Sequence, residues 1–158
     1  MSRSKEIANR AREVLLNGKW IANTNFKEQL LQVTYQQATQ QISNLNTIAK
    51  LTFHVNYYLV GLLEVFNGGD LTIKDKFSFD MPPVISETDW QRLRDELFNS
   101  SEQFAKKIEQ MPDALLGQPF VKEEYGSYLR NIDAIIEHCY YHLGQVSLLR
   151  KMIMHDHS

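Results

Sequence analysis

Residues 45–66 have the sequence LNTIAKLTFHVNYYLVGLLEVF, the strongest helical pattern in the chain. Its apolar residues recur every three to four positions, which is the spacing of one face of an α-helix. Asn44 or Asn46 can cap its start, and the Asn-Gly-Gly sequence at 67–69 is typical of a helix end. The pattern predicts one long helix whose broad apolar surface must be covered by other helices.

On either side of this segment, three more stretches have helical spacing, at residues 4–16, 86–111 and 127–154. Shorter helical pieces are predicted at 26–31 and 34–40, and an irregular connection at 70–87. Almost nothing alternates with period two for long enough to build a sheet. We therefore predict an all-α fold, a four-helix bundle with short accessory helices, formed by residues 1–158 as a single domain.

The charge balance and the cysteine count exclude several classes of function. There are 17 Lys and Arg against 19 Asp and Glu, a net charge of -2, so nucleic acid is not an expected partner. Cys139 is the single cysteine, so any metal must use histidine or carboxylate ligands. No membrane span and no signal peptide are expected, since no apolar run is long enough, and we predict a cytoplasmic protein.

Two histidines of the last predicted helix have the spacing of a metal site. His138 and His142 are four residues apart, so they lie on one face, about 40° apart, at the border of the apolar stripe. His54, in the middle of the 45–66 helix, can supply a third ligand. Three imidazoles suit zinc, nickel, iron or copper, with zinc and nickel leading, and they leave a coordination position open for water or substrate. The alternative is that these histidines make separate hydrogen bonds and bind no metal.

The sequence around these histidines resembles the DinB-like superfamily. Residues 133–146, DAIIEHCYYHLGQV, are similar to its C-terminal signature H-x-x-x-H-x-G-Q-[IV], and Leu-Leu-Arg at 148–150 continues the likeness. Residues 48–54, IAKLTFH, resemble the segment that carries its other histidine. The resemblance implies a four-helix bundle, usually a homodimer, with a divalent metal ion held by three histidines. Those positions here are His54, His138 and His142.

The resemblance also implies an activity. Characterised relatives are metal-assisted transferases or isomerases that use low-molecular-weight thiols such as bacillithiol or mycothiol, and others are described as hydrolases. We therefore expect a metal-dependent enzyme of the thiol (S-)transferase or hydrolase type that acts on a small-molecule substrate. The alternative is a non-catalytic, metal-binding or small-molecule-binding helical-bundle dimer. A closed structural site predicts a fourth protein ligand such as Glu64 or Glu137.

Several other residues are candidates for supporting roles. Gln145 shares a face with His138 and His142 and can orient one of the rings, unless it only packs beside Gly144, whose missing side chain would admit a neighbouring helix. The candidates for orienting His54 are Asn56, Tyr57 and Tyr58. Cys139 falls in the apolar stripe, which favours a buried, inert thiol.

The remaining candidate functional residues have explanations that involve no active site. His155 and His157 lie in a polar tail, where adventitious metal binding is expected. Arg150 is expected to complement the carbonyl end of the last helix or a surface carboxylate. Five aromatic residues can wall a substrate pocket, although aromatic residues at such spacing are more often core: Trp20, Tyr35, Phe77, Phe79 and Trp90.

Overall fold

The computed structural model describes residues 1–155, and this part of the chain is all-α, as predicted. Four long helices are joined by short accessory ones and by 3₁₀ turns, and within the described residues no β-strand forms. Residues 1–155 form six α-helices, which are α1 (Arg3–Arg12), α2 (Phe26–Leu31), α3 (Tyr35–Thr39), α4 (Ile48–Phe66), α5 (Glu87–Glu109) and α6 (Tyr128–His155). No helix of the described part is apolar over a length that could cross a membrane.

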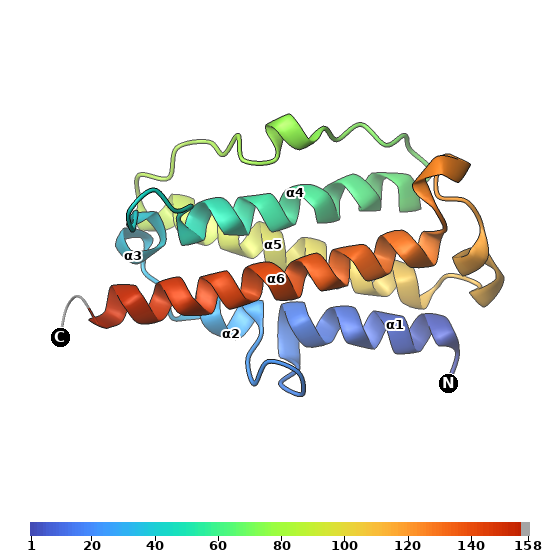
Figure 1. Cartoon of the computed structure of the whole chain (residues 1–158), viewed down its shortest axis with the longest axis horizontal. Coiled ribbons are helices and arrows are strands. Elements are labelled where there is room, and N and C mark those ends of the chain that lie inside the picture. Colours follow the sequence, from blue (N-terminus) through green and yellow to red (C-terminus); the bar gives the residue numbers. More distant parts are fainter. Residues whose placement is uncertain (156–158) are drawn as a thin grey trace.

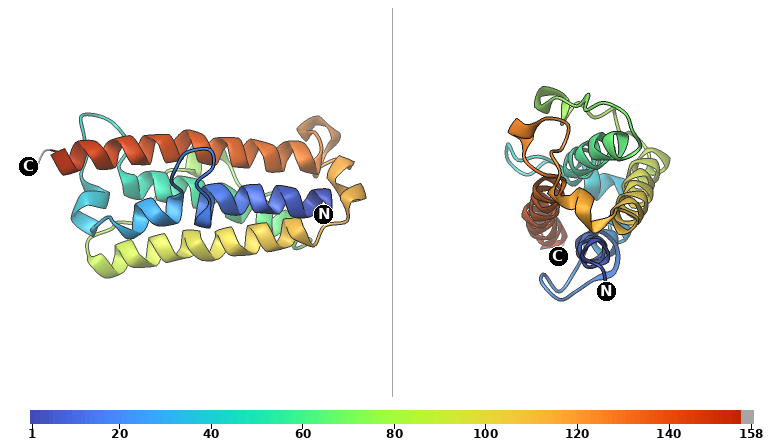
Figure 2. Two further views of the ribbon diagram at one scale, coloured as in Figure 1. Left: turned by 90° about the horizontal axis from the view of Figure 1, so that it is seen from below. Right: turned by 90° about the vertical axis from the view of Figure 1, so that its right-hand side faces the viewer.

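The four longest helices lie side by side around a common interior, as the end view in Figure 2 shows. Helices α4 and α5 run in one direction, and α1 and α6 run in the opposite direction (Figure 1). Helix α4 packs against both α5 and α6, while α1 packs against α5. The middle of α4 therefore faces the middle of α6 across the interior.

The connection between α4 and α5, residues 67–86, runs back along the outside of α4, where Figure 1 shows it in green along the top. We call these residues the strap. Because α4 and α5 are parallel, the chain must return over the length of α4, which is about 28 Å for its 19 residues. The strap is irregular, as predicted, except for one 3₁₀ turn at Asp75–Phe77. Its midpoint passes the middle of α4.

The ends of the helices follow local capping chemistry. Helix α4 ends at the predicted Asn-Gly-Gly: Gly69 N–H donates to the Glu64 carbonyl and Gly68 N–H to the Val65 carbonyl, with Gly68 at φ 91°. This is a Schellman motif, in which a glycine adopts the left-handed conformation. The start of α4 is capped by Thr47, whose side chain accepts a hydrogen bond from the Lys50 N–H, so the prediction that Asn44 or Asn46 is the cap was wrong.

The other boundaries were predicted closely. Ser86 caps α5 through the Asp89 N–H, and α6 starts at Tyr128. The helix predicted at residues 4–16 is α-helical only as far as Arg12, and residues 13–17 form a π-helix before Gly18. Thr34 and Gln37 form a capping box at the start of α3.

The core is a continuous cluster of apolar side chains drawn from all the long helices. Trp90 and Phe104 of α5, Leu59 of α4 and Leu143 of α6 are essentially fully buried in it. The indole N–H of Trp90 donates to the Val33 carbonyl at 2.7 Å, which satisfies its one polar atom. A core of this extent stabilises the fold by burying apolar surface, independently of any bound ion.

Candidate metal centre

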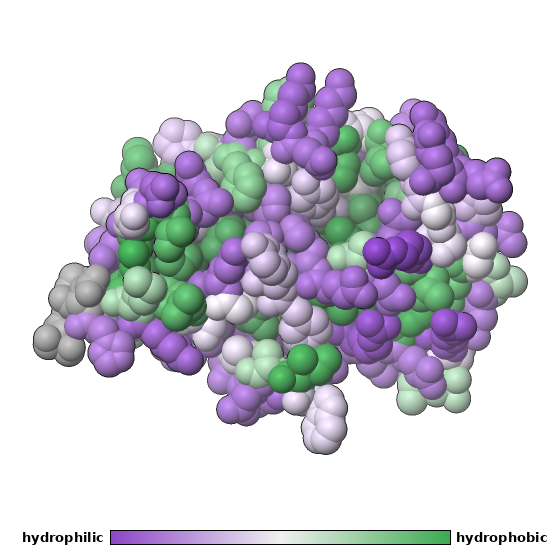
Figure 3. All heavy atoms as spheres, viewed as in Figure 1, coloured by the Kyte–Doolittle hydropathy of each residue, from purple (hydrophilic) through white to green (hydrophobic). Residues whose placement is uncertain are grey.

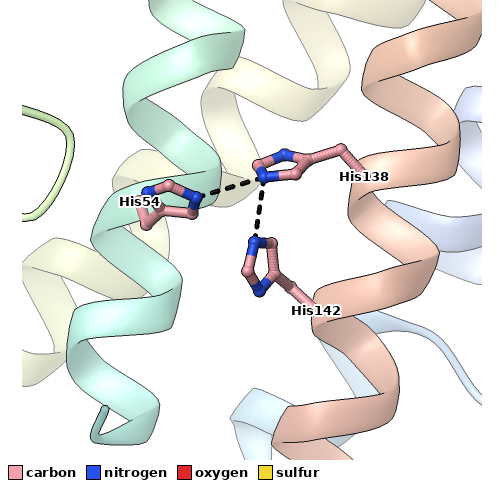
Figure 4. Close-up of side chains that lie close together, drawn as sticks. All are labelled: His54, His138 and His142. Carbon is pink, nitrogen blue, oxygen red and sulfur yellow. Dashed lines mark hydrogen bonds between the residues drawn. The ribbon is translucent and has the colours of Figure 1, made fainter. Parts of the chain in front are cut away.

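Three imidazole rings meet between the middle of α4 and the middle of α6 (Figure 4). His54 comes from α4, and His138 and His142 come from successive turns of α6. The Nε2 atom of His138 lies 3.1 Å from Nε2 of His54 and 2.9 Å from Nε2 of His142. His54 and His142 are each only 6% exposed. The structure therefore brings together the three histidines selected from the sequence, with one nitrogen of each within 4.8 Å of the others.

The strap fixes the ring of His54 from outside the helix pair. Nδ1 of His54 lies 3.3 Å from the carbonyl oxygen of Ser78. Phe79 stacks flat on the same ring, with centroids 4.0 Å apart and planes 6° apart. The expectation that Asn56, Tyr57 or Tyr58 orients His54 directly was wrong, because the acceptor is a backbone carbonyl 24 residues along the chain.

The two tyrosines act one step further away, by tying the strap to α4. Tyr57 donates its hydroxyl proton to the Lys74 carbonyl at 2.9 Å and accepts from the Lys74 N–H at 2.8 Å. Tyr58 donates to the carboxylate of Asp75 at 2.8 Å, and its ring lies edge-on to His54 and His138. These bonds hold the strap a few residues before Ser78 and so place the Ser78 carbonyl over His54.

Gln145 fixes the ring of His142, as predicted. Its Oε1 accepts from Nδ1 of His142 at 2.7 Å, one helical turn along α6. The packing role considered for Gly144 was wrong, since a Cβ added there would have no neighbour within 4 Å. Gln145 thus acts as a hydrogen-bond partner of the His142 ring. Gly144 lies on the surface of α6, and no other part of the described chain packs against it.

These contacts determine which nitrogens carry protons. A carbonyl oxygen only accepts, so Nδ1 of both His54 and His142 must be protonated, and Nε2 of each neutral ring presents a lone pair. Both lone pairs point toward Nε2 of His138, whose single proton can satisfy only one of them. With three neutral rings, at least one buried nitrogen lone pair is left without a proton to accept. A cation bound between the rings would satisfy these lone pairs.

Burial keeps the three rings uncharged at neutral pH. Desolvation lowers the pKa of His138 to about 4, with repulsion from His142 and His54 as the smaller causes. Desolvation is also the main cause that lowers the pKa of His54 and of His142, while the Ser78 carbonyl and Gln145 oppose it. Metal binding requires neutral imidazoles, so the cluster is already in its ligating form at pH 7.

The donor set fits a small divalent ion. A tetrahedral site with metal–nitrogen bonds of 2.0–2.1 Å places its nitrogens about 3.3 Å apart, slightly more than the two Nε2 separations of 2.9 and 3.1 Å. Movements of a few tenths of an ångström in the side chains would bring the nitrogens to that spacing. Imidazole nitrogens suit zinc and nickel among the common metals.

Within residues 1–155, no fourth His, Cys, Asp or Glu side chain joins the three rings. Glu64 accepts from the Thr72 hydroxyl at 2.9 Å, and Glu137 pairs with Arg130 at 3.7 Å, so both carboxylates considered as a fourth ligand are engaged elsewhere. Three protein ligands and a free position are the pattern of catalytic metal sites, whereas structural zinc sites are usually closed by four.

The other candidates from the sequence fall into clear groups. Cys139 is fully buried, as predicted, and desolvation raises its pKa to about 12, which favours the inert thiol expected from the sequence. Arg150 donates to the side chains of Gln29 and Gln32 at 3.5 and 2.6 Å, so the expected carboxylate or helix-end partner was wrong. His155 ends α6 apart from the cluster, and His157 lies outside the described residues.

Of the five aromatic candidates for a pocket wall, only Phe79 touches the histidine cluster. Trp90 is buried in the core, and Tyr35 is partly buried and packs against the core cluster. Phe77, on the strap, is 44% exposed. Trp20 is 92% exposed, which is not the burial expected of a residue in a pocket wall.

The fold and the site define an all-helical protein with a buried cluster of three histidines. Residues 24–146, well over half of the chain, match the family profile described as the DinB superfamily. The chain therefore belongs to the DinB superfamily. No curated protein and no solved structure shows significant similarity to it.

Proposed function

We propose that this protein is a metal-dependent enzyme whose divalent ion is held by His54, His138 and His142. The observation that carries the proposal is the convergence of three Nε2 atoms, two of them with lone pairs fixed by Nδ1 contacts to Ser78 and Gln145. Membership of the DinB superfamily supports it. Zinc and nickel are the ions that this donor set favours.

The chain's own residues prepare the site for chemistry. A bound divalent ion supplies a Lewis acid that lowers the pKa of a water or thiol beside it. The Ser78 carbonyl and Gln145 keep two rings in the required tautomer and orientation, which maintains both their basicity and their geometry. Phe79 covers one face of His54 and excludes water from it.

The reaction that we propose is transfer of a thiol to a small electrophilic substrate, or hydrolysis of such a substrate. Cys139 does not supply the nucleophile, since it is buried and its pKa is raised to about 12. In a thiol transfer, the thiol must therefore come from solution, as a low-molecular-weight thiol. The cluster contains three histidines and no fourth His, Cys, Asp or Glu of residues 1–155, which supports both reactions, because each needs a free position beside the ion.

The test is the metal content per chain, measured by mass spectrometry on protein truncated after Met154 to remove the tail histidines. His54→Ala and His142→Ala should each lose about one divalent ion per chain while the helical circular dichroism is retained. Glu137→Gln is the matched control, because Glu137 precedes His138 but pairs with Arg130, and it should keep the ion.

Two results would contradict this proposal. One is the absence of metal after reconstitution with zinc or nickel, and the other is full retention of metal in both histidine variants. Metal that is lost as expected, but with no turnover of electrophiles in the presence of thiols or water, would instead favour the non-catalytic metal-binding alternative.

We also propose the assembly expected from the resemblance, which is a single four-helix-bundle domain that forms a homodimer in the cytoplasm. The four long helices around a common interior support the bundle. Multi-angle light scattering of the purified protein tests the dimer, and a mass of one chain at micromolar concentration would contradict it.

A further inference from the structure

A cavity of about 380 Å³ lies beside the histidine cluster, between the start of α4 and the C-terminal half of α6. Figure 3 shows a hydrophobic area over this part of the surface. Five of the eight lining residues are apolar, including Leu51, Leu148 and Met152. The other three carry uncharged amides: Asn44, Asn46 and Gln145. The volume falls in the range of small-molecule sites, about 300–1,000 Å³.

Gln145 connects this cavity to the histidines. Its Oε1 is occupied by the Nδ1 proton of His142 at 2.7 Å. Its amide nitrogen has no hydrogen-bond partner among residues 1–155, although Gln145 lines the cavity and is only partly exposed. An amide nitrogen carries two donors, so a ligand in the cavity can accept a hydrogen bond from the same side chain that orients His142.

We propose that this cavity binds an uncharged small molecule with an apolar body and a carbonyl-type acceptor, and that Gln145 donates to that acceptor. The site does not depend on a bound ion, because the cavity and the amide belong to the chain itself. When an ion is present, occupancy of the cavity is coupled to it through one side chain, from the ligand to Gln145 and from Gln145 to His142.

The charge of the lining selects the class of ligand. None of the eight described lining residues is ionisable, so a carboxylate or ammonium group would lose its hydration without gaining an ion pair. The leucines and Met152 favour apolar groups, and the amides favour neutral acceptors and donors. A second copy of this chain is the competing occupant, because Leu45 and Leu148 at the cavity are 48% and 60% exposed.

The probe for the test is 6-propionyl-2-dimethylaminonaphthalene, a neutral fluorophore with an apolar body and one ketone. Titration into the purified protein, with and without prior dialysis against a chelator, should give a blue-shifted emission with one site per chain in both cases. The anionic 1-anilinonaphthalene-8-sulfonate should bind at least about tenfold more weakly, because burying its charge is unfavourable.

Two variants locate the probe. Leu148→Glu places a charge at an exposed position of the lining and should abolish binding. Gln145→Glu keeps an oxygen for the Nδ1 proton of His142 but removes the donor, and should weaken binding about tenfold or more. Trp20→Ser, which removes the most exposed aromatic side chain outside the cavity, should leave the affinity unchanged.

Unchanged probe affinity in either cavity variant overturns the assignment. So does a failure of the probe to bind together with self-association that Leu148→Glu abolishes, since the cavity would then be part of an interface between copies. Failure of the metal proposal has a different signature: the probe binds as expected, and no divalent ion is found in the protein.

Discussion

Phe79 lies flat against His54, with ring centroids 4.0 Å apart and planes 6° apart, although the two residues belong to segments that run in opposite directions. The stacking covers one face of the imidazole, while the neighbouring Ser78 carbonyl holds its Nδ1 proton. One short piece of the strap therefore determines both the orientation and the solvation of a candidate metal ligand.

We expect Phe79→Ala to weaken zinc binding by about tenfold, the lower end of the effect of losing an outer partner of a metal-binding histidine. The physical reason is that His54 gains rotational freedom and water reaches its ring. Isothermal titration calorimetry measures the change. Phe77→Ala on the same strap is the control, since Phe77 is 44% exposed and should leave the affinity unaltered. Equal effects of the two substitutions would show that the stacking is unimportant.

Gln145→Leu should reduce metal affinity by roughly 10- to 100-fold, because Nδ1 of His142 loses its acceptor and the ring is free to change tautomer. Gln145→Glu should retain affinity, since a carboxylate oxygen accepts the same proton. Competition with a chromophoric zinc chelator measures both. If Gln145→Leu bound zinc as tightly as the natural protein, the contact at 2.7 Å would have no role in ligation.

The stability of the metal-free protein should fall as the pH decreases from about 6.5 toward 4. In the unfolded chain the imidazoles take up protons near pKa 6.5, whereas burial lowers the pKa of His138 to about 4 in the folded chain and also lowers that of His54 and His142. The unfolded state thus binds more protons in this window, and the free energy of unfolding decreases. Thermal melts in the presence of a chelator measure this loss.

His138→Gln is the comparison for that pH series, because it removes the imidazole whose pKa is lowered to about 4 and leaves a polar side chain of similar reach. Its melting temperature should depend less steeply on pH between 6.5 and 4. Parallel curves for the two proteins would mean that His138 titrates normally in the folded chain.

Removal of the ion should lower the melting temperature without unfolding the protein at 25 °C. An ion that binds only the folded state stabilises it in proportion to the logarithm of its concentration relative to Kd, while the apolar core holds the helices together without it. Circular dichroism before and after dialysis against a chelator tests this. Loss of the helical signal on chelation would indicate a structural site.

Cys139 should resist thiol reagents in the native state. The residue is fully buried and its pKa is raised to about 12, so almost no thiolate is present at pH 8. Reaction with 5,5′-dithiobis(2-nitrobenzoate) should be slow until denaturant is added, and Cys139→Ser should abolish the residual signal. Rapid labelling of the native protein would show that the Cys139 thiol is accessible and reactive, and Cys139 would again be a candidate nucleophile.

The sequence predicts the parts of this site that depend on helical periodicity. The four-residue spacing of His138 and His142 places them on one face of α6, and Gln145, three residues further, follows the same rule. His54 is a candidate from the sequence because it is a lone histidine in the middle of a strongly apolar helix. The α6 residues are neighbours because three- and four-residue intervals place them on one face. His54 joins them because the apolar surface of α4 must pack against another helix.

The strap contacts were not predictable in the same way. Ser78 acts through its backbone carbonyl, which any residue type can provide, so no side-chain pattern marks it. Tyr57 and Tyr58 were correctly placed near His54, but their hydroxyls bind residues 74 and 75, which only the course of the strap brings into reach. Trp20 shows the converse limit: its aromatic character predicts burial, and the structure leaves it 92% exposed.

The parallel arrangement of α4 and α5 also bears on the order of events during folding. The Nε2 atoms of His54 and His138 lie 3.1 Å apart although the residues are 84 positions apart, and the Ser78 carbonyl that orients His54 belongs to the strap. We expect contacts of such long range to form late, because closing the long intervening loop costs chain entropy. Capture of the ion would then complete assembly instead of nucleating it, so the rate of metal uptake by a refolding chain would report the docking of α6.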